Sequence, residues 1–81
     1  MRIFIDTANI DQIRQAAKLG VVSGVTTNPS LVSQEGTTDY QTAIKEICSI
    51  ISGPVSAEVV VEGVEPMIEQ ARSIATWAPN I

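Results

Sequence analysis

The chain has 81 residues, 44% of them hydrophobic, and a formal net charge of −4 at pH 7. This composition excludes intrinsic disorder, and the length suffices for one small domain at most, with a thin margin of stability. A net negative charge without a Lys/Arg cluster argues against nucleic acid and membranes as partners. The absence of histidine excludes imidazole catalysis and histidine metal ligands.

The first predicted strand is the β-prone run Ile3-Phe4-Ile5, which stops at Asp6. The run is far too short for the apolar core of a signal peptide, so we expect a soluble, unprocessed protein. A helix is predicted to start at Asn9, where Gln12 completes a pattern that resembles a capping box. It is expected to end at Gly20, because a left-handed residue belongs there.

The second strand is predicted over residues 21–27, which are rich in β-branched side chains. The pair Asn28-Pro29 ends it, because proline cannot continue a central ladder and restricts the residue before it. A loop is predicted to follow, through the polar stretch 33–38. Apolar residues then recur at helical intervals over residues 40–51 and stop at Gly53-Pro54, which predicts the second helix.

The third strand is predicted over residues 55–61, a run of Val and Ala interrupted by Ser56 and Glu58, as in a parallel sheet covered on both faces. Pro66 suits the first turn of the helix that follows. The apolar stripe of this helix consists of Met67, Ile68, Ala71, Ile74, Ala75 and Ala78. After Pro79-Asn80 the sequence stops at Ile81, where a fourth strand is expected.

The single cysteine, Cys48, belongs to the apolar stripe of the second predicted helix. One cysteine cannot form an internal disulfide, and a free cysteine in such a stripe is expected to pack in the core. No apolar run approaches the length of a membrane span. These features favour a reducing compartment, and we predict a cytoplasmic protein.

Strands and helices alternate, with connections whose length implies right-handed crossovers and a parallel sheet. We therefore predict an α/β fold in which residues 1–81 form three β/α units. A closed barrel of this type takes eight such units and about 250 residues. The chain is thus expected to be the N-terminal portion of a single domain, with sheet edges and helix faces uncovered.

Polar residues gather at the predicted carboxyl ends of the strands, where parallel α/β proteins carry their functional sites. Side chains alternate along a strand, so each predicted strand has one face with polar residues near its end. These residues are Asp6 on the first strand, Thr26 and Asn28 on the second, and Glu58 on the third. A carboxylate inside a parallel strand is costly to desolvate unless it is paired, hydrogen-bonded or wet. We therefore predict that Asp6, Asn28 and Glu58 converge on one pocket, with Thr26 beside them.

Purely structural interpretations of these residues stay open. Glu58 can be an exposed residue of an edge strand, and Asp6 a cap or turn residue before the first helix. Thr26, Thr27 and Asn28 can form a hydrogen-bonded turn into Pro29, and this interpretation is favoured for Thr27, which faces away from the others.

Four other residues are assigned structural places. Lys18 and Lys45 lie on predicted helices, where solvated surface positions are expected and a buried nucleophilic amine is not. Tyr40 and Trp77 are predicted to pack.

Three segments carry a family resemblance: Ile5-Asp6-Thr7-Ala8-Asn9, Gly24-Val25-Thr26-Thr27-Asn28-Pro29-Ser30 and Ser56-Ala57-Glu58-Val59. In order and spacing they resemble the N-terminal third of the transaldolase family, in its short-subunit branch. The second segment is highly specific and the other two moderately so. The resemblance covers essentially the whole chain.

The resemblance implies a (β/α)8 TIM barrel that acts in the pentose phosphate pathway. It implies transfer of a dihydroxyacetone unit between sugar phosphates through a Schiff base on a strand-four lysine, without metal or organic cofactor. A homo-oligomer is implied for the full-length chain.

Site roles follow from the resemblance position by position. Asp6 matches the acid/base aspartate of the family, and Asn28 matches the asparagine that binds the hydroxyl groups of the substrate. Thr26 lines the same pocket, and Glu58 matches the carboxylate that orients a catalytic water. Fructose-6-phosphate aldolases tend to carry glutamine at this last position, so Glu58 favours a transaldolase over that lyase.

The resemblance also implies that the Schiff-base lysine lies a few residues beyond Ile81. The 81-residue chain is therefore predicted to be inactive alone, because acid/base groups cannot replace an amine that bonds to the substrate. Two alternatives stay open. One is a non-catalytic fragment whose open sheet associates with another copy or chain. The other is a phosphoryl-transfer domain that uses Asp6, although its pattern requires a second aspartate where this chain has Ala8.

Overall fold

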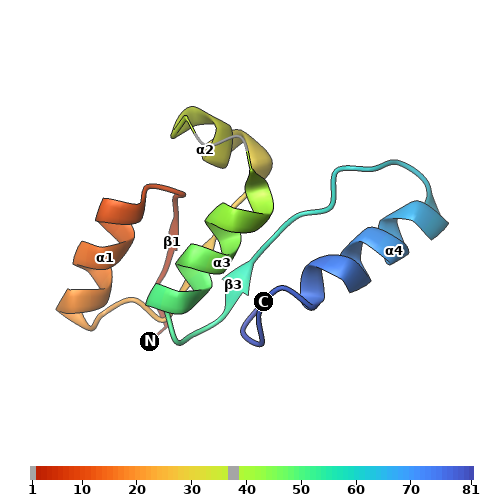
Figure 1. The fold of residues 1–81 in the computed structure, drawn as a ribbon. Helices are drawn as coiled ribbons and strands as arrows, with labels where there is room; N and C mark the ends of the chain where they lie inside the picture. The colour runs from red at the N-terminus through yellow and green to blue at the C-terminus, as the bar shows by residue number, and fades with distance from the viewer. Residues whose placement is uncertain (1, 37–38) are drawn as a thin grey trace.

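The structure is a computed structural model that describes residues 2–36 and 39–81 (Figure 1). Its elements in chain order are β1 (Phe4–Asp6), α1 (Ile10–Leu19), β2 (Gly24–Thr26), α2 (Pro29–Gln34), α3 (Tyr40–Ile50), β3 (Val55–Ser56) and α4 (Val64–Ala75). The strands form one parallel sheet in the order β1-β2-β3. The predicted alternation of parallel strands and helices is confirmed.

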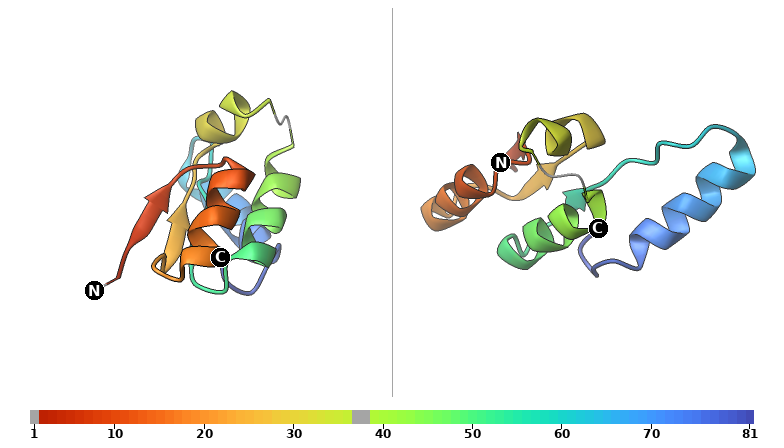
Figure 2. Two further views of the ribbon diagram at one scale, coloured as in Figure 1. Left: turned by 90° about the vertical axis from the view of Figure 1, so that its left-hand side faces the viewer. Right: turned by 45° about the horizontal axis from the view of Figure 1, so that its top comes forward.

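One face of the sheet is covered by α1 and α3, which lie side by side (Figure 2). Ile13 of α1 and Ile47 of α3 are fully buried against Val25 of β2 and Val55 of β3. Cys48 packs against this cluster at its edge, as predicted. The main core therefore lies between the sheet and two helices, because both helices present apolar stripes to the same side.

The opposite face of the sheet is open, so the expectation of a sheet covered on both faces is wrong for the described part of the chain. On this face the side chain of Phe4 is 44% exposed, and Asp6 and Ser56 are exposed as well. The ring of Phe4 lies over Gly24, where an added Cβ would stand 2.6 Å from its Cε2 atom. Glycine at this position therefore lets the ring lie against β2.

Both predicted ends of α1 are confirmed. Asn9 caps the helix, since its Oδ1 atom accepts a hydrogen bond from the backbone N–H of Gln12 at 2.9 Å. The side chain of Gln12 does not return to the cap but accepts a hydrogen bond from the hydroxyl of Thr7 at 3.1 Å. Gly20 ends the helix in the left-handed region at φ 71°, where a residue without a Cβ is favoured.

The prediction of a loop after Asn28-Pro29 is wrong for the first part of this segment, because α2 starts there. Pro29 occupies the first turn of α2, and the side chain of Asn28 caps it. Proline lacks the N–H that a first helical turn leaves unpaired anyway, and asparagine is a favoured cap. The same two residues thus end a strand and begin a helix. Residues 37 and 38 of the predicted loop lie outside the described residues.

The second and third strands are shorter than predicted: residues 24–26 instead of 21–27, and residues 55–56 instead of 55–61. Beyond Ser56, three backbone amides bond to side chains instead of a neighbouring strand. Glu58 N–H donates to the hydroxyl of Tyr40 at 3.0 Å, and Val60 and Val61 both donate to Oε1 of Gln70. A β-prone run without a partner strand cannot continue a ladder.

Helix α4 stands at the side of the sheet (Figure 1), with Pro66 in its first turn as predicted. Of its predicted apolar stripe only Ile74 is buried, while Met67 and Ile68 are exposed. After the helix, Trp77 packs edge-on against Tyr40, with the ring centroids 6.1 Å apart. The expected uncovered helix face is thus present on α4.

Within the described ranges, no helix is long and apolar enough to cross a membrane.

The first turn of α3 depends on the charge of Asp39. Hydrogen bonds from the Thr42 hydroxyl and from the Thr42 and Gln41 N–H groups, together with the nearby charge of Lys45, lower the pKa of Asp39 below its ordinary value of 3.8. A carboxyl whose folded-state pKa is lowered stabilises the fold above its unfolded pKa, and this contribution is lost as the pH falls through the folded pKa. We expect the difference in Tm between the native chain and Asp39→Asn to shrink below about pH 3.8.

Thermal unfolding followed by circular dichroism across the acid range measures this difference. Comparison with Asp39→Asn isolates the charge, since asparagine keeps a capping oxygen. A difference that stays constant on acidification would contradict the assignment.

Candidate functional site

The carboxyl ends of β1 and β2 meet through a side-chain hydrogen bond. Asp6 and Thr26 are the last residues of these strands and stand opposite each other in the parallel register. The hydroxyl Oγ1 of Thr26 donates to Oδ1 of Asp6 at 2.9 Å. Both side chains lie on the open face of the sheet, so the carboxylate is held in place while it stays accessible to a ligand.

Asn28 follows β2 by two residues and takes part in the start of α2. Its Oδ1 atom accepts a hydrogen bond from the N–H of Leu31 at 2.9 Å. The cap engages the carbonyl oxygen of the amide and leaves the Nδ2 group outside this bond. Asn28 is half-buried, so the structural interpretation holds for one end of its side chain, and the donor end is the part suited to a ligand.

Glu58 lies two residues past the end of β3, with an exposed side chain. Its backbone is held from the core side by Tyr40, whose hydroxyl accepts from Glu58 N–H at 3.0 Å. The same hydroxyl lies 3.2 Å from Oγ1 of Thr27. The backbone of Glu58 is therefore held in position by a side chain from the helix-covered side of the sheet.

Thr27 is the buried polar residue that contacts Tyr40 beneath Glu58. Its side chain is 2% exposed, and its hydroxyl donates to the carbonyl of Ser56 at 2.8 Å. A structural role is confirmed for Thr27, but its hydroxyl bonds across the sheet to β3 and not within the predicted turn into Pro29. The sequence indicated that Thr27 faces away from the site, but it held no signal that Thr27 and Tyr40 would together support Glu58.

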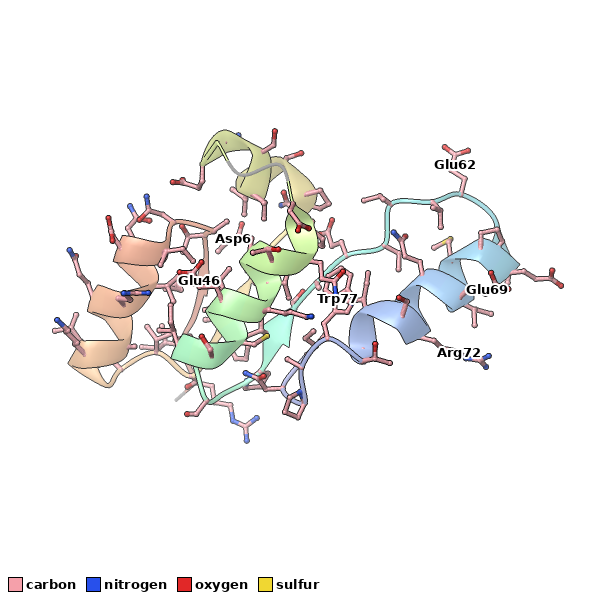
Figure 3. All side chains as sticks on the ribbon, viewed as in Figure 1. Asp6, Glu46, Glu62, Glu69, Arg72 and Trp77 are labelled. Carbon is pink, nitrogen blue, oxygen red and sulfur yellow. The ribbon has the colours of Figure 1, made fainter. Side chains whose placement is uncertain are left out.

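The predicted site residues lie at the carboxyl ends of neighbouring parallel strands or just past them, at one edge of the sheet. The structure brings Asp6 and Thr26 into contact and gives Asn28 and Glu58 other partners. Figure 3 shows Asp6 at the level of the first turns of α1 and α3, far from Glu62, Glu69 and Arg72 around α4. Convergence of Asp6, Asn28 and Glu58 on one ligand stays a prediction.

Neither lysine lies at this edge. Lys18 is in the last turn of α1, and because the helix starts beside the carboxyl end of β1 and runs back, it lies near the opposite edge of the sheet. Lys45 lies on α3, and both side chains are exposed. The predicted surface positions of Lys18 and Lys45 are confirmed.

A cleft of about 250 Å³ lies beside this edge, lined by residues of α1, α2 and α3 and their flanks: Ala8, Asn9, Ile10, Asp11, Val32, Glu35, Thr42, Ala43 and Glu46. Two of its carboxylates are engaged, Glu35 with Nδ2 of Asn9 at 2.9 Å and Glu46 with Arg14 at 3.4 Å. In the part of the chain that the structure describes, no three His, Cys, Asp or Glu residues are grouped to hold a metal ion. The cleft includes none of the predicted site residues.

Comparison with known proteins identifies the family. The family model described as Transaldolase/Fructose-6-phosphate aldolase matches residues 3–81. A "Probable transaldolase" of Dehalococcoides mccartyi is 56% identical over 82 residues, which cover 100% of this chain and 38% of the relative.

Proteins with the same name from Streptococcus equi subsp. zooepidemicus and Streptococcus pyogenes serotype M5 are 57% and 53% identical over 81 residues, which cover 100% of this chain and 37% of each relative. The chain spans a little over a third of the length of the curated relatives it matches. The chain belongs to the transaldolase/fructose-6-phosphate aldolase family.

Proposed function

We propose that residues 1–81 are the N-terminal portion of a single (β/α)8 TIM-barrel domain with transaldolase activity. The reaction is the transfer of a dihydroxyacetone unit between sugar phosphates through a Schiff base. The single observation that supports it most is the Asp6–Thr26 pair, with 2.9 Å between its oxygens, on the open face of a parallel sheet. Family membership supplies the reaction class.

The open face of the sheet supports the proposal that the complete domain is a barrel. Helices α1 and α3 cover one side of the sheet, and Phe4, Asp6 and Ser56 are exposed on the other. In a closed barrel the helices form the outer ring, and the face without helices becomes the interior. Further strands would enclose these side chains and exclude bulk water from them.

In this proposal Asp6 is the acid/base group. A Schiff base withdraws electrons as the carbon–carbon bond of the sugar breaks, and a carboxylate then takes the proton from the hydroxyl of the departing aldehyde. Thr26 holds the carboxylate through its hydroxyl, and the Nδ2 group of Asn28 donates to substrate hydroxyls. Glu58 orients the water that takes part in forming and hydrolysing the Schiff base.

The choice between a transaldolase and a fructose-6-phosphate aldolase rests on Glu58. The family includes both activities. A carboxylate at this position, where the aldolases tend to carry glutamine, favours the transferase. The relatives named above are all called transaldolases.

The 81-residue chain should not form a Schiff base with fructose 6-phosphate. Its two lysines, Lys18 and Lys45, are exposed on helices and lie away from Asp6, and a Schiff base needs an amine at the substrate carbonyl. Borohydride reduction followed by intact-mass measurement checks this. The matched sample is a chimera of residues 1–81 with the remaining part of the Dehalococcoides mccartyi relative, for which we expect one adduct.

Both possible failures are informative. An adduct on the 81-residue chain would show that one of its own lysines is the nucleophile. No adduct on a chimera that is folded by circular dichroism, when the parent relative forms one, would remove the enzyme assignment from this chain.

A further inference from the structure

The side chain of Asn80 ties the end of the chain to the connection between α3 and β3. Its Nδ2 group lies within hydrogen-bond distance of three backbone carbonyls: Ile51 at 2.8 Å, Gly53 at 3.0 Å and Cys48 at 3.3 Å. Two of these belong to the last turn of α3 and its cap, where carbonyl groups lack partners within the helix. An amide NH2 has two hydrogens, so one of them is shared between two carbonyls.

The backbone of Asn80 is hydrogen-bonded to the sheet. Its carbonyl accepts a hydrogen bond from Val55 N–H at 2.8 Å, which places it beside β3 (Figure 1). The same arrangement joins β2 to β3, where Val25 N–H donates to the carbonyl of Pro54 at 3.0 Å. In that pair Val25 stands opposite Val55, the residue after the acceptor. By the same pattern, a parallel strand that starts at Asn80 would place Ile81 opposite Val55.

The register of such a strand decides which of its residues reach the open face. With Ile81 opposite Val55, the first and third residues after Ile81 stand level with Ser56 and Glu58 and share their face. Side chains alternate along a strand, so a slip of one residue would turn these two to the helix-covered side. A contact that fixes the beginning of the strand therefore also fixes which face its functional residues point to.

We propose that Asn80 is a positioning residue: its side chain fixes the start and the register of a fourth parallel strand beside β3. This rests on the proposed function, in which that strand carries the Schiff-base lysine. Asn80 touches no substrate. It acts through the strand, and its three carbonyl contacts are what a shorter or non-donating side chain would lose.

The test uses the chimera with the Dehalococcoides mccartyi relative and the variants Asn80→Ala and Asn80→Asp. Alanine removes all three contacts, and a carboxylate accepts hydrogen bonds and cannot donate them to carbonyls. We expect kcat to fall by about 10- to 100-fold in both variants, because a misplacement of about 1 Å costs this much. The KM for fructose 6-phosphate should stay within about twofold, since the substrate-binding groups lie on other strands.

Ile74→Val is the matched control, because it removes a methylene from a buried residue of α4. It should lower the Tm and leave kcat unchanged. Amide hydrogen exchange supplies a readout that does not depend on activity: the Val55 N–H should exchange faster in both Asn80 variants and not in the control.

Each result decides between separate claims. A lower Tm with unchanged kcat in the Asn80 variants would overturn the positioning role and leave a structural one. An inactive unsubstituted chimera would overturn the proposed function, and the exchange of Val55 N–H would still decide whether Asn80 anchors the strand. If Asn80→Ala does not fold, Asn80→Ser, a smaller polar side chain, takes its place under the same criteria.

Discussion

Replacement of Asp6 by asparagine should lower the turnover of fructose 6-phosphate by about 10²- to 10⁴-fold, the usual contribution of a general acid or base. The substitution is nearly isosteric. Asparagine keeps the oxygen that accepts from Oγ1 of Thr26 at 2.9 Å, so the hydrogen bond between the ends of β1 and β2 should persist. What is lost is the ability to accept and return a proton.

Steady-state kinetics of the chimera with the Dehalococcoides mccartyi relative measures this effect. Asp11→Asn is the matched control, since Asp11 is an exposed carboxylate in the first turn of α1. Turnover in the control should be unchanged. Equal turnover in the Asp6→Asn protein and the unsubstituted one, with unchanged far-ultraviolet circular dichroism, would reduce Asp6 to a structural residue.

Replacement of Ile47 by alanine should cost about 2–5 kcal/mol in the free energy of unfolding, as is usual for a buried isoleucine. Ile47 is 0% exposed and lies in the core cluster with Ile13 and Val25. Domains are stable by about 5–15 kcal/mol, and short chains lie at the low end of this range. We therefore expect the variant of the 81-residue chain to keep at most about 3 kcal/mol of stability at 25 °C.

Urea unfolding followed by circular dichroism measures the loss. Ile68→Ala is the matched control, because Ile68 is 45% exposed on α4. Its cost should be below about 1 kcal/mol, in line with surface substitutions. Equal costs for the two variants would mean that Ile47 does not lie in a packed core.

The helix ends that the sequence predicted correctly depend on local chemistry. The cap at Asn9, the left-handed Gly20 and the first-turn Pro66 each involve groups within a few residues, so the pattern contains all the information needed. The pair Asn28-Pro29 shows what a local sequence pattern leaves undecided. Proline ends a strand and suits a first helical turn equally well, and the local pattern did not indicate that α2 begins there.

The candidate site was predictable in part for the same reason. Asp6, Thr26, Asn28 and Glu58 could be placed at strand ends because the alternation of strands and helices implies where parallel strands finish. Their partners could not be predicted. The bond between Thr26 and Asp6 joins residues 20 positions apart, and the support of Glu58 by Tyr40 spans 18 positions.

By itself the sequence determined the order of the strands and of helices α1, α3 and α4, the parallel β/α class, the polar residues at the strand ends and the family resemblance, because these follow from local periodicity, capping and motifs. Only the tertiary structure decided that α1 and α3 cover a single face, that β3 stops at Ser56, and that Asn80 holds the α3–β3 connection. Each of these depends on which backbone and side-chain groups distant parts of the chain bring into hydrogen-bond or packing distance. No local pattern records that information.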